Sequence, residues 1–232
     1  MIEVSPAESA ADLDLVYKLT HDAWVDEGLI EPRPSGRMIR HPELDNNEKT
    51  IVLLARDENG TCIGTNSITM DSPLGLPMDH GLKDQVDSVR AQLGTIAGSW
   101  RIATAPVCRS RVSVLSALII KTIDIAESWE VDSCLFLFAM RHERIYQKLI
   151  GARTICHRPG FYSDAPLWTP ALMRVDRGWF GKGKDGYEGI RKLVRRGGPQ
   201  SRVASSSPPH LPGHWSGLEQ TEMRLTPDYL GR

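Results

Sequence analysis

Residues 95–140 read TIAGSWRIATAPVCRSRVSVLSALIIKTIDIAESWEVDSCLFLFAM, and their pattern sets the fold class. Thr95–Ala105 is typical of a strand, and Pro106 ends it because proline cannot donate a hydrogen bond to a sheet. Arg111–Trp129 places valine, leucine and isoleucine on one broad face, as an amphipathic helix does. Ser133–Met140 is apolar almost throughout, which is typical of a strand covered on both faces. This order predicts a parallel pair of strands joined by a crossover helix.

Upstream of this segment, the pattern predicts a helix and a hairpin. Apolar residues recur at helical spacing over Asp12–Val25. Thr50–Asp57 and Thr61–Asp71 are β-rich, and the Asn-Gly step at 59–60 supplies the positive φ of a tight turn, so an antiparallel hairpin is predicted. The polar segment Glu31–Lys49 is too long for a simple connection, and we expect it to cover a site.

Four further elements are predicted around the central segment. Asp84–Leu93 and His142–Leu149 have helical patterns, while Thr154–His157 and Leu167–Val175 resemble strands. The alternation of strands and helices after residue 95 predicts parallel pairing through crossovers. The predicted fold class is therefore α/β (α+β mixed), with a mixed sheet and helices on both faces.

The domain organisation follows from a change in composition near residue 176. We expect residues 1–176 to form one domain and 177–232 to be a basic, Gly/Ser/Pro-rich flexible tail. From Arg177 to Arg202 there are eight Lys/Arg residues against two acidic ones. Because the tail is poor in apolar residues, the domain is expected to fold without it.

Composition excludes several classes of protein. The net charge of −1 over 232 residues gives no electrostatic case for nucleic-acid binding. The four cysteines form no C-x-x-C pair, and Cys62, Cys134 and Cys156 lie in apolar runs where a reduced cysteine acts as a small hydrophobe. The start of the chain shows no secretory signal, and the apolar stretches are shorter than the ~20 residues of a membrane span. These features predict a cytoplasmic protein without stable membrane insertion.

The element order, together with particular residues, resembles the GNAT acyltransferases. In that superfamily a central strand, here Thr95–Ala105, splays from its neighbour, and an acyl-thioester arm lies in the gap. The following helix, here starting near Arg111, presents its N-terminus to a phosphate of the carrier. Residues 144–151, RIYQKLIG, resemble the family's "Y-x-x-x-G-F" region with one extra residue. The resemblance implies that Tyr146 is the acid toward the leaving thiolate; the alternative is that Tyr146 fills core space.

A departure from the GNAT pattern indicates the donor. Members that use CoA have a glycine-rich turn, R/Q-x-x-G-x-G/A, because only glycine lets backbone amides approach a pyrophosphate closely. Residues 109–114 read RSRVSV and contain no glycine. Arg109 and Arg111 with two hydroxyl groups suit a single phosphate, as on the phosphopantetheine of acyl carrier protein.

That donor points to the branch of acyl-homoserine-lactone synthases and N-acyl amino acid synthases. Residues 17–28, YKLTHDAWVDEG, resemble their opening "Y-R-L-R-x-x-v-F/Y-v-E-E-G". Asp45 matches an acidic residue before the first strand, the sequence IGT at 63–65 matches "v-G-t", and SWRIA at 99–103 resembles "E-x-S-R-l-a", with Arg101 as the match.

Three positions separate the two groups. Thr20 and Ser67 replace arginines of the lactone synthases, and Gly98 stands where a glutamate would act as base. The resemblance is therefore closer to the N-acyl amino acid synthases, including those that make long-chain N-acyl tyrosine. It implies transfer of a long-chain acyl group from acyl carrier protein to the α-amine of an amino acid, with no permanently bound cofactor.

The resemblance also implies a set of site residues. We expect catalytic roles for Tyr146, Arg101 and Asp45, and an oxyanion bound by a backbone N–H near Ile102 or Ala103. The further substrate-binding candidates are Trp24, Trp100, Arg109 and Arg111, with Trp168 as another aromatic. Each of these candidates has a structural alternative. The tryptophans could belong to the core, and Arg101 could be a strand residue paired with an acid. Asp45 could cap a loop, and Arg109 and Arg111 could form a solvated start of a helix.

The general base and a metal site are less defined. Glu27, Asp45, His21 and His142 could each accept the proton of the ammonium, and so could water. His41 and Asp45 resemble a pair of metal ligands, but their loop offers no third partner and acyl transfer needs no metal, so no metal site is predicted.

Other functions remain open on the sequence. An acyl-homoserine-lactone synthase and a CoA-dependent N-acetyltransferase share the fold. A non-catalytic module that binds an acyl group or its carrier protein is a further alternative, because no base is evident. N-acyl amino acids in the extract of a bacterial host would favour the first function, and lactones would favour the second.

Overall fold

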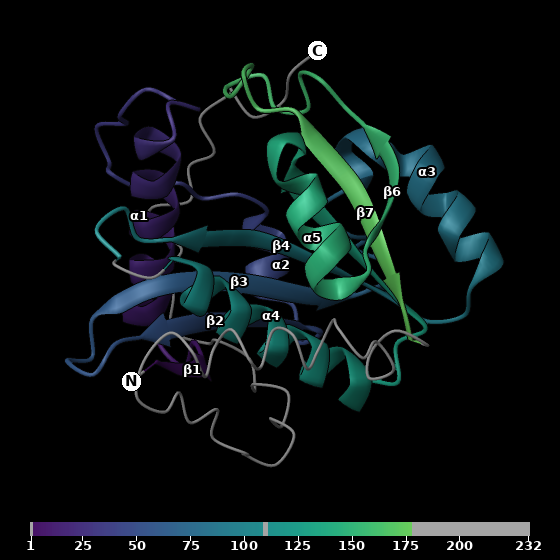
Figure 1. Ribbon diagram of the computed structural model, residues 1–232, viewed down its shortest axis with the longest axis horizontal. Coiled ribbons are helices and arrows are strands. Elements are labelled where there is room, and N and C mark those ends of the chain that lie inside the picture. Colours follow the sequence, from purple (N-terminus) through teal and green to yellow (C-terminus); the bar gives the residue numbers. More distant parts are fainter. Residues whose placement is uncertain (1, 109–110, 178–232) are drawn as a thin grey trace.

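A mixed sheet in the order β1-β2-β3-β4-β5-β7-β6 runs through the residues that the computed structural model describes, 2–108 and 111–177 (Figure 1). The strands are β1 (Glu3–Pro6), β2 (Thr50–Arg56), β3 (Cys62–Met70), β4 (Ile96–Thr104), β5 (Ser133–Ala139), β6 (Arg153–His157) and β7 (Pro170–Asp176). The helices are α1 (Ala10–Asp26), α2 (Pro42–Asp45), α3 (Asp79–Gln92), α4 (Arg111–Ser128) and α5 (Glu143–Ile150), with a 3-10 turn, η1 (Met140–His142). The predicted tail from residue 178 lies outside the described residues.

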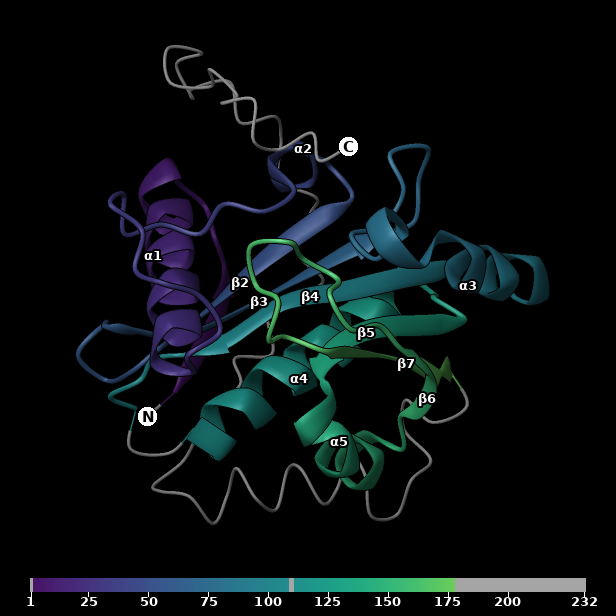
Figure 2. The same cartoon turned by 90° about the horizontal axis from the view of Figure 1, so that it is seen from above.

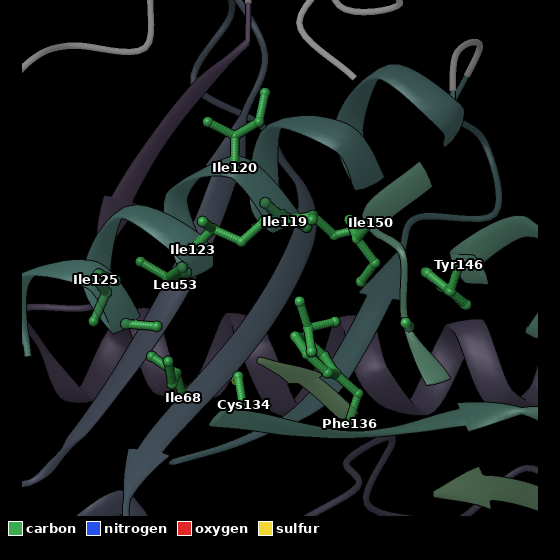
Figure 3. Packing of buried hydrophobic residues seen from close by; sticks show 14 of the residues in the cluster. Leu53, Ile68, Ile119, Ile120, Ile123, Ile125, Cys134, Phe136, Tyr146 and Ile150 are labelled. Carbon is green, nitrogen blue, oxygen red and sulfur yellow. The ribbon is translucent and has the colours of Figure 1, made fainter. Parts of the chain in front are cut away.

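Helices cover both faces of the sheet, as predicted: α4 and α5 lie on one face, α1 and α3 on the other (Figure 2). Alternate side chains of a strand point to opposite faces. Leu53 of β2 therefore packs in the cluster under α4, which also contains Ile119 and Phe136 (Figure 3), while Leu54 packs in the cluster under α1. None of the helices that the structure describes combines the length and the hydrophobicity of a membrane-spanning segment.

The splay predicted for the central strand is present between β4 and β5. These two strands are parallel, as α4 requires, but they pair only between Ile96–Ser99 and Ser133–Phe136. The register of β4 with β3 shifts after Trp100, and Arg101 has a positive φ of 59°, so a β-bulge turns the strand here. The C-terminal halves of β4 and β5 therefore separate.

The expected pairing of the second crossover is wrong. The pattern predicted β6 beside β5, but β7 lies between them and is antiparallel to both. The physical reason is burial: Ala171, Leu172 and Met173 of β7 are completely buried, while β6 is partly exposed and suits an edge. The strand β1 and the helix α2 are both four residues long and were not predicted.

Gly64 lets α4 lie directly on the sheet. A Cβ atom at this position would lie 2.5 Å from Cγ1 of Val114 and 3.1 Å from Cδ1 of Leu118. No side chain therefore fits between β3 and the first turns of α4. This contact fixes the start of α4 next to the splayed end of β4.

Candidate active site

A cavity of about 310 Å³ opens between the splayed halves of β4 and β5. The two strands form its floor, with α1 and the loop after it on one side and α4 and α5 on the other. Most of the lining is apolar: Ala23, Trp24, Leu29, Met38, Trp100, Ile102, Ala103, Val112, Leu115, Leu137, Phe138, Ala139, Ile145, Tyr146, Tyr162 and Trp168. A cavity of this kind suits an acyl chain.

The cavity brings together most of the residues predicted from the sequence. Trp24, Trp100, Arg101, Ile102, Ala103, Arg111, Tyr146 and Trp168 all line it. Asp45 does not line the cavity but contacts a residue that does. Arg109 lies outside the described residues. The loop expected to cover a site does so through Met38 and Arg40.

Arg101 and Asp45 form a buried ion pair beneath the cavity. Arg101 Nη2 lies 2.8 Å from Asp45 Oδ1, and the two side chains are only 2% and 1% exposed. Tyr17 donates a further hydrogen bond to Asp45 Oδ2 at 2.8 Å. Burial raises the pKa of the Asp45 carboxyl group, and the Arg101 guanidinium opposes this rise. Asp45 thus holds Arg101 in position.

The Arg101 guanidinium keeps unused donors. Its Nη2 also donates to the Arg40 carbonyl oxygen at 2.9 Å, but buried Nε and Nη1 have no hydrogen-bond partner among the described residues. Its Cζ lies 4.1 Å from the centroid of the Trp100 ring. Buried donors without a partner are unfavourable, so this arginine suits a bound anion.

Aromatic rings and a second arginine form the neighbouring wall. Tyr162 and Trp168 stack with ring centroids 5.2 Å apart, and Trp24 lies 5.2 Å from Trp168. The Arg40 guanidinium lies 3.7 Å from the centroid of the Tyr162 ring, within the range of a cation–π contact. Arg40 also binds the carboxylate of Asp164 at 2.8 Å.

The other end of the cavity is ringed by ion pairs. Arg111, at the start of α4, binds Asp26 at the end of α1 at 2.9 Å. Glu27 binds Arg141, which follows β5. All four residues line the cavity and are partly exposed to solvent. Because exposed pairs contribute little to stability, these arginines can exchange a carboxylate for a phosphate.

Tyr146 lies inside the cavity wall rather than at its mouth. The side chain is buried and stacks on Phe138, with ring centroids 3.4 Å apart. Burial raises the pKa of its hydroxyl above the usual value, so the group stays protonated at neutral pH. A protonated hydroxyl at this place can donate a proton.

The candidate bases differ in position. Both ring nitrogens of His21 are engaged, with Asp22 at 2.9 Å and with the Arg33 N–H at 3.0 Å, and His21 does not line the cavity. Glu27 lines it but is paired with Arg141. His142 lines the cavity, and burial lowers its pKa, so its imidazole is neutral at neutral pH.

Sequence reasoning missed Arg40, Tyr162 and Arg141 as lining residues. Tyr162 had one visible signal, because the aromatic pair Phe161-Tyr162 interrupts a polar Pro/Gly loop where aromatics are not needed for a core. Arg40 and Arg141 had no such signal in the sequence, because the side chain of a loop arginine usually points into solvent.

The family model of the N-acyl amino acid synthase FeeM matches residues 15–171 of the chain. This match covers more than half of the 232 residues. The chain belongs to the FeeM family of N-acyl amino acid synthases. No curated protein sequence matches it significantly. The FeeM family is a family of N-acyltransferases, and the matched region contains all the residues that line the cavity.

Solved structures share this fold. FeeM from uncultured soil microbes aligns with a TM-score of 0.63 at 14% identity, covering 77% of this chain and 97% of FeeM. MesI, a CoA-dependent acyl-homoserine lactone synthase, aligns with a TM-score of 0.55 at 15% identity, covering 89% of this chain and 100% of MesI. A mosquito arylalkylamine N-acetyltransferase-like protein, 5b, aligns with a TM-score of 0.54 at 14% identity. The alignment covers 75% of this chain and 99% of the mosquito protein. The mixed sheet and these neighbours confirm the GNAT-like fold.

Proposed function

We propose that the protein transfers a long-chain acyl group from acyl carrier protein to the α-amine of an amino acid. The observation that carries this proposal is the apolar cavity in the splay of β4 and β5, which has an arginine with unused donors beneath it. The apolar lining suits the acyl chain, and Arg101 suits the carboxylate of an amino acid. The free cysteines Cys62, Cys108, Cys134 and Cys156 suit a reducing compartment such as the cytoplasm.

The reaction forms one amide and releases one thiol. The amine nitrogen attacks the thioester carbonyl carbon, a C–N bond forms and an oxyanion develops. Beyond Ser99, β4 has no paired residue in β5, so an N–H near Ile102 suits that oxyanion, whereas the Ala103 N–H is directed at its partner Thr65 in β3.

Before the attack, neutral His142 takes a proton from the ammonium to give the free amine. The C–S bond then breaks, Tyr146 protonates the thiolate, and the amide nitrogen returns its second proton to the Tyr146 phenolate.

The start of α4 supports a carrier with one phosphate. Val112 and Val114 stand where a pyrophosphate loop needs glycine, and Val114 is packed on β3. Arg111 and Arg141 both line the cavity, and both guanidinium groups contact the Glu27 carboxylate. Two exchangeable arginines suit both a phosphate and the acidic surface expected of a carrier protein.

An amino acid is favoured over the substrate of a lactone synthase by the packing at Gly98. A Cβ atom there would lie 2.9 Å from Met78 Sδ and 3.4 Å from Leu76 Cδ2. The segment before α3 therefore fills the space in which a glutamate would act as base. This packing supports the amino acid synthase as the first candidate.

The test is a single-turnover assay with purified protein and long-chain acyl carrier protein. Each of the common amino acids is offered in turn, and the products are identified by mass spectrometry. The proposal expects N-acyl amino acids, with aromatic acceptors among the best because of the Trp24–Tyr162–Trp168 wall. Acyl-homoserine lactone formed from S-adenosylmethionine, or no product from any amine, contradicts it.

Tyr146→Phe is expected to lower kcat by about 100-fold while changing KM little, because an acid for the leaving group acts in the transition state. Steady-state kinetics with an acyl carrier thioester measures this. The ring still stacks on Phe138, so the melting temperature should stay unchanged. A wild-type kcat would assign Tyr146 to packing alone.

Arg111→Glu is expected to raise KM for the acyl carrier protein about 10-fold at low salt, with a smaller effect at high salt because ions screen exposed charges. An acyl-pantetheine without phosphate should barely respond. Lys83→Glu on α3 is the matched control, since Lys83 is an exposed cation away from the cavity. Equal losses on both donors would indicate damage to the fold, and no loss on either would remove Arg111 from carrier binding.

A further inference from the structure

We propose that His41, Glu43 and His80 bind a single divalent transition-metal ion of the zinc type. One ligand atom from each residue lies within 4.8 Å of the other two. Glu43 Oε1 is 3.4 Å from His41 Nδ1 and 3.8 Å from His80 Nε2. The three ligand atoms thus lie around one common point. A small adjustment of their side chains would bring all three within bonding distance of an ion at that point.

The fold brings these residues together from two separate segments. His41 precedes α2, Glu43 lies within it, and His80 lies in the first turn of α3. The centroids of the His41 and His80 rings lie 4.6 Å apart. The sequence suggested Asp45 as the metal ligand beside His41, but the Asp45 carboxylate is paired with Arg101. The residues that join His41 in the cluster are Glu43 and His80.

The ligand set selects the class of ion. Two imidazoles and a carboxylate suit Zn²⁺ and its neighbours in the transition series, whereas Mg²⁺ and Ca²⁺ prefer oxygen ligands alone. Three protein ligands leave one position of a tetrahedral ion for water. The side chains of Glu43 and His80 are 48% and 64% exposed, so an ion can enter without opening the fold.

A hydrogen bond to the other ring nitrogen of His41 supports this arrangement. His41 Nε2 lies 3.4 Å from the Tyr162 hydroxyl oxygen, to which it can donate a hydrogen bond. With that proton on Nε2, Nδ1 is left as the ligand atom, as in metal sites whose histidines are oriented through their other nitrogen. Tyr162 and Trp100, whose ring meets His41 edge-on at 5.5 Å, both line the acyl-transfer cavity. A bound ion would therefore fix one wall of the cavity without taking part in acyl transfer.

The experiment is a zinc titration of the untagged, full-length protein after chelator treatment, by calorimetry and by thermal melting. We expect one Zn²⁺ per chain and a melting temperature that rises with zinc. His80→Asn and Glu43→Gln should each weaken zinc affinity by at least about tenfold. His157→Asn is the matched control, because His157 pairs with Glu143 without a second histidine, and it should bind zinc as the wild type does.

Two further measurements locate the ion. Tyr162→Phe keeps all three ligands but removes the hydroxyl group that orients His41, so it should weaken zinc affinity by about tenfold. The Co²⁺ complex should show d–d bands without a thiolate charge-transfer band. The proposal is overturned if zinc does not bind, if His80→Asn binds it as tightly as the wild type, or if the cobalt spectrum shows thiolate ligands. None of these outcomes depends on the acyltransferase activity.

Discussion

Arg101→Met is expected to lower the free energy of unfolding by about 3–5 kcal/mol, because it leaves the buried Asp45 carboxylate without its cation. For a domain of this size that corresponds to a fall in melting temperature of about 10 °C. It should also lower kcat/KM for amino acids about 10- to 100-fold, the value of a charged hydrogen bond to the acceptor's carboxylate. Thermal melting and steady-state kinetics measure the two effects.

The double variant Arg101→Met/Asp45→Leu separates these effects. Replacing both partners by apolar side chains removes the unpaired charge, so most of the lost stability should return. Activity toward the amino acid should not return, and the preference for tyrosine over tyramine, which lacks the carboxylate, should disappear. If the double variant keeps this preference, Arg101 has a structural role only.

A donor with a long acyl chain on acyl carrier protein is expected to exceed acetyl-CoA by at least about 100-fold in kcat/KM. Each methylene group buried in the cavity contributes about 0.8 kcal/mol, so four of them already account for roughly that factor. The missing glycines at the start of α4 add a preference for the single phosphate.

Four donors separate chain length from carrier: acetyl and long-chain groups, each on CoA and on acyl carrier protein. The cavity predicts the effect of length and the start of α4 predicts the effect of the carrier. Ala139→Phe fills the splayed end of β5 and should remove the preference for length while sparing the acetyl donors. Comparable kcat/KM for all four donors would refute the proposal and favour a CoA-dependent acetyltransferase.

The elements of the fold were predictable because their signals are local. The helical spacing in α1 and α4 and the Asn-Gly turn between β2 and β3 each lie within a short segment. The position of β7 was not predictable in this way. Its insertion between β5 and β6 depends on contacts such as Ser133 with Asp176, which are distant in the sequence.

Residues of the candidate site could be predicted where they belong to a short sequence motif. Arg101 and Asp45 were identified through a resemblance, and the structure pairs them, but the motif did not show that Asp45 holds Arg101 from outside the cavity. Arg40 and Tyr162 come from two loops whose meeting depends on the whole fold. The Phe161-Tyr162 pair marks Tyr162 as unusual for a loop, but local sequence does not show that it meets Arg40.

The place of β7 in the sheet has a consequence for synthesis of the chain. Translation delivers β5, α5 and β6 before the strand that joins them. Until residues 170–176 leave the ribosome, β5 lacks the neighbour that finally separates it from β6, and both present open edges to other nascent chains. The hairpin of β2 and β3 closes early because its partners are near in sequence, whereas the sheet as a whole is completed only by its last strand.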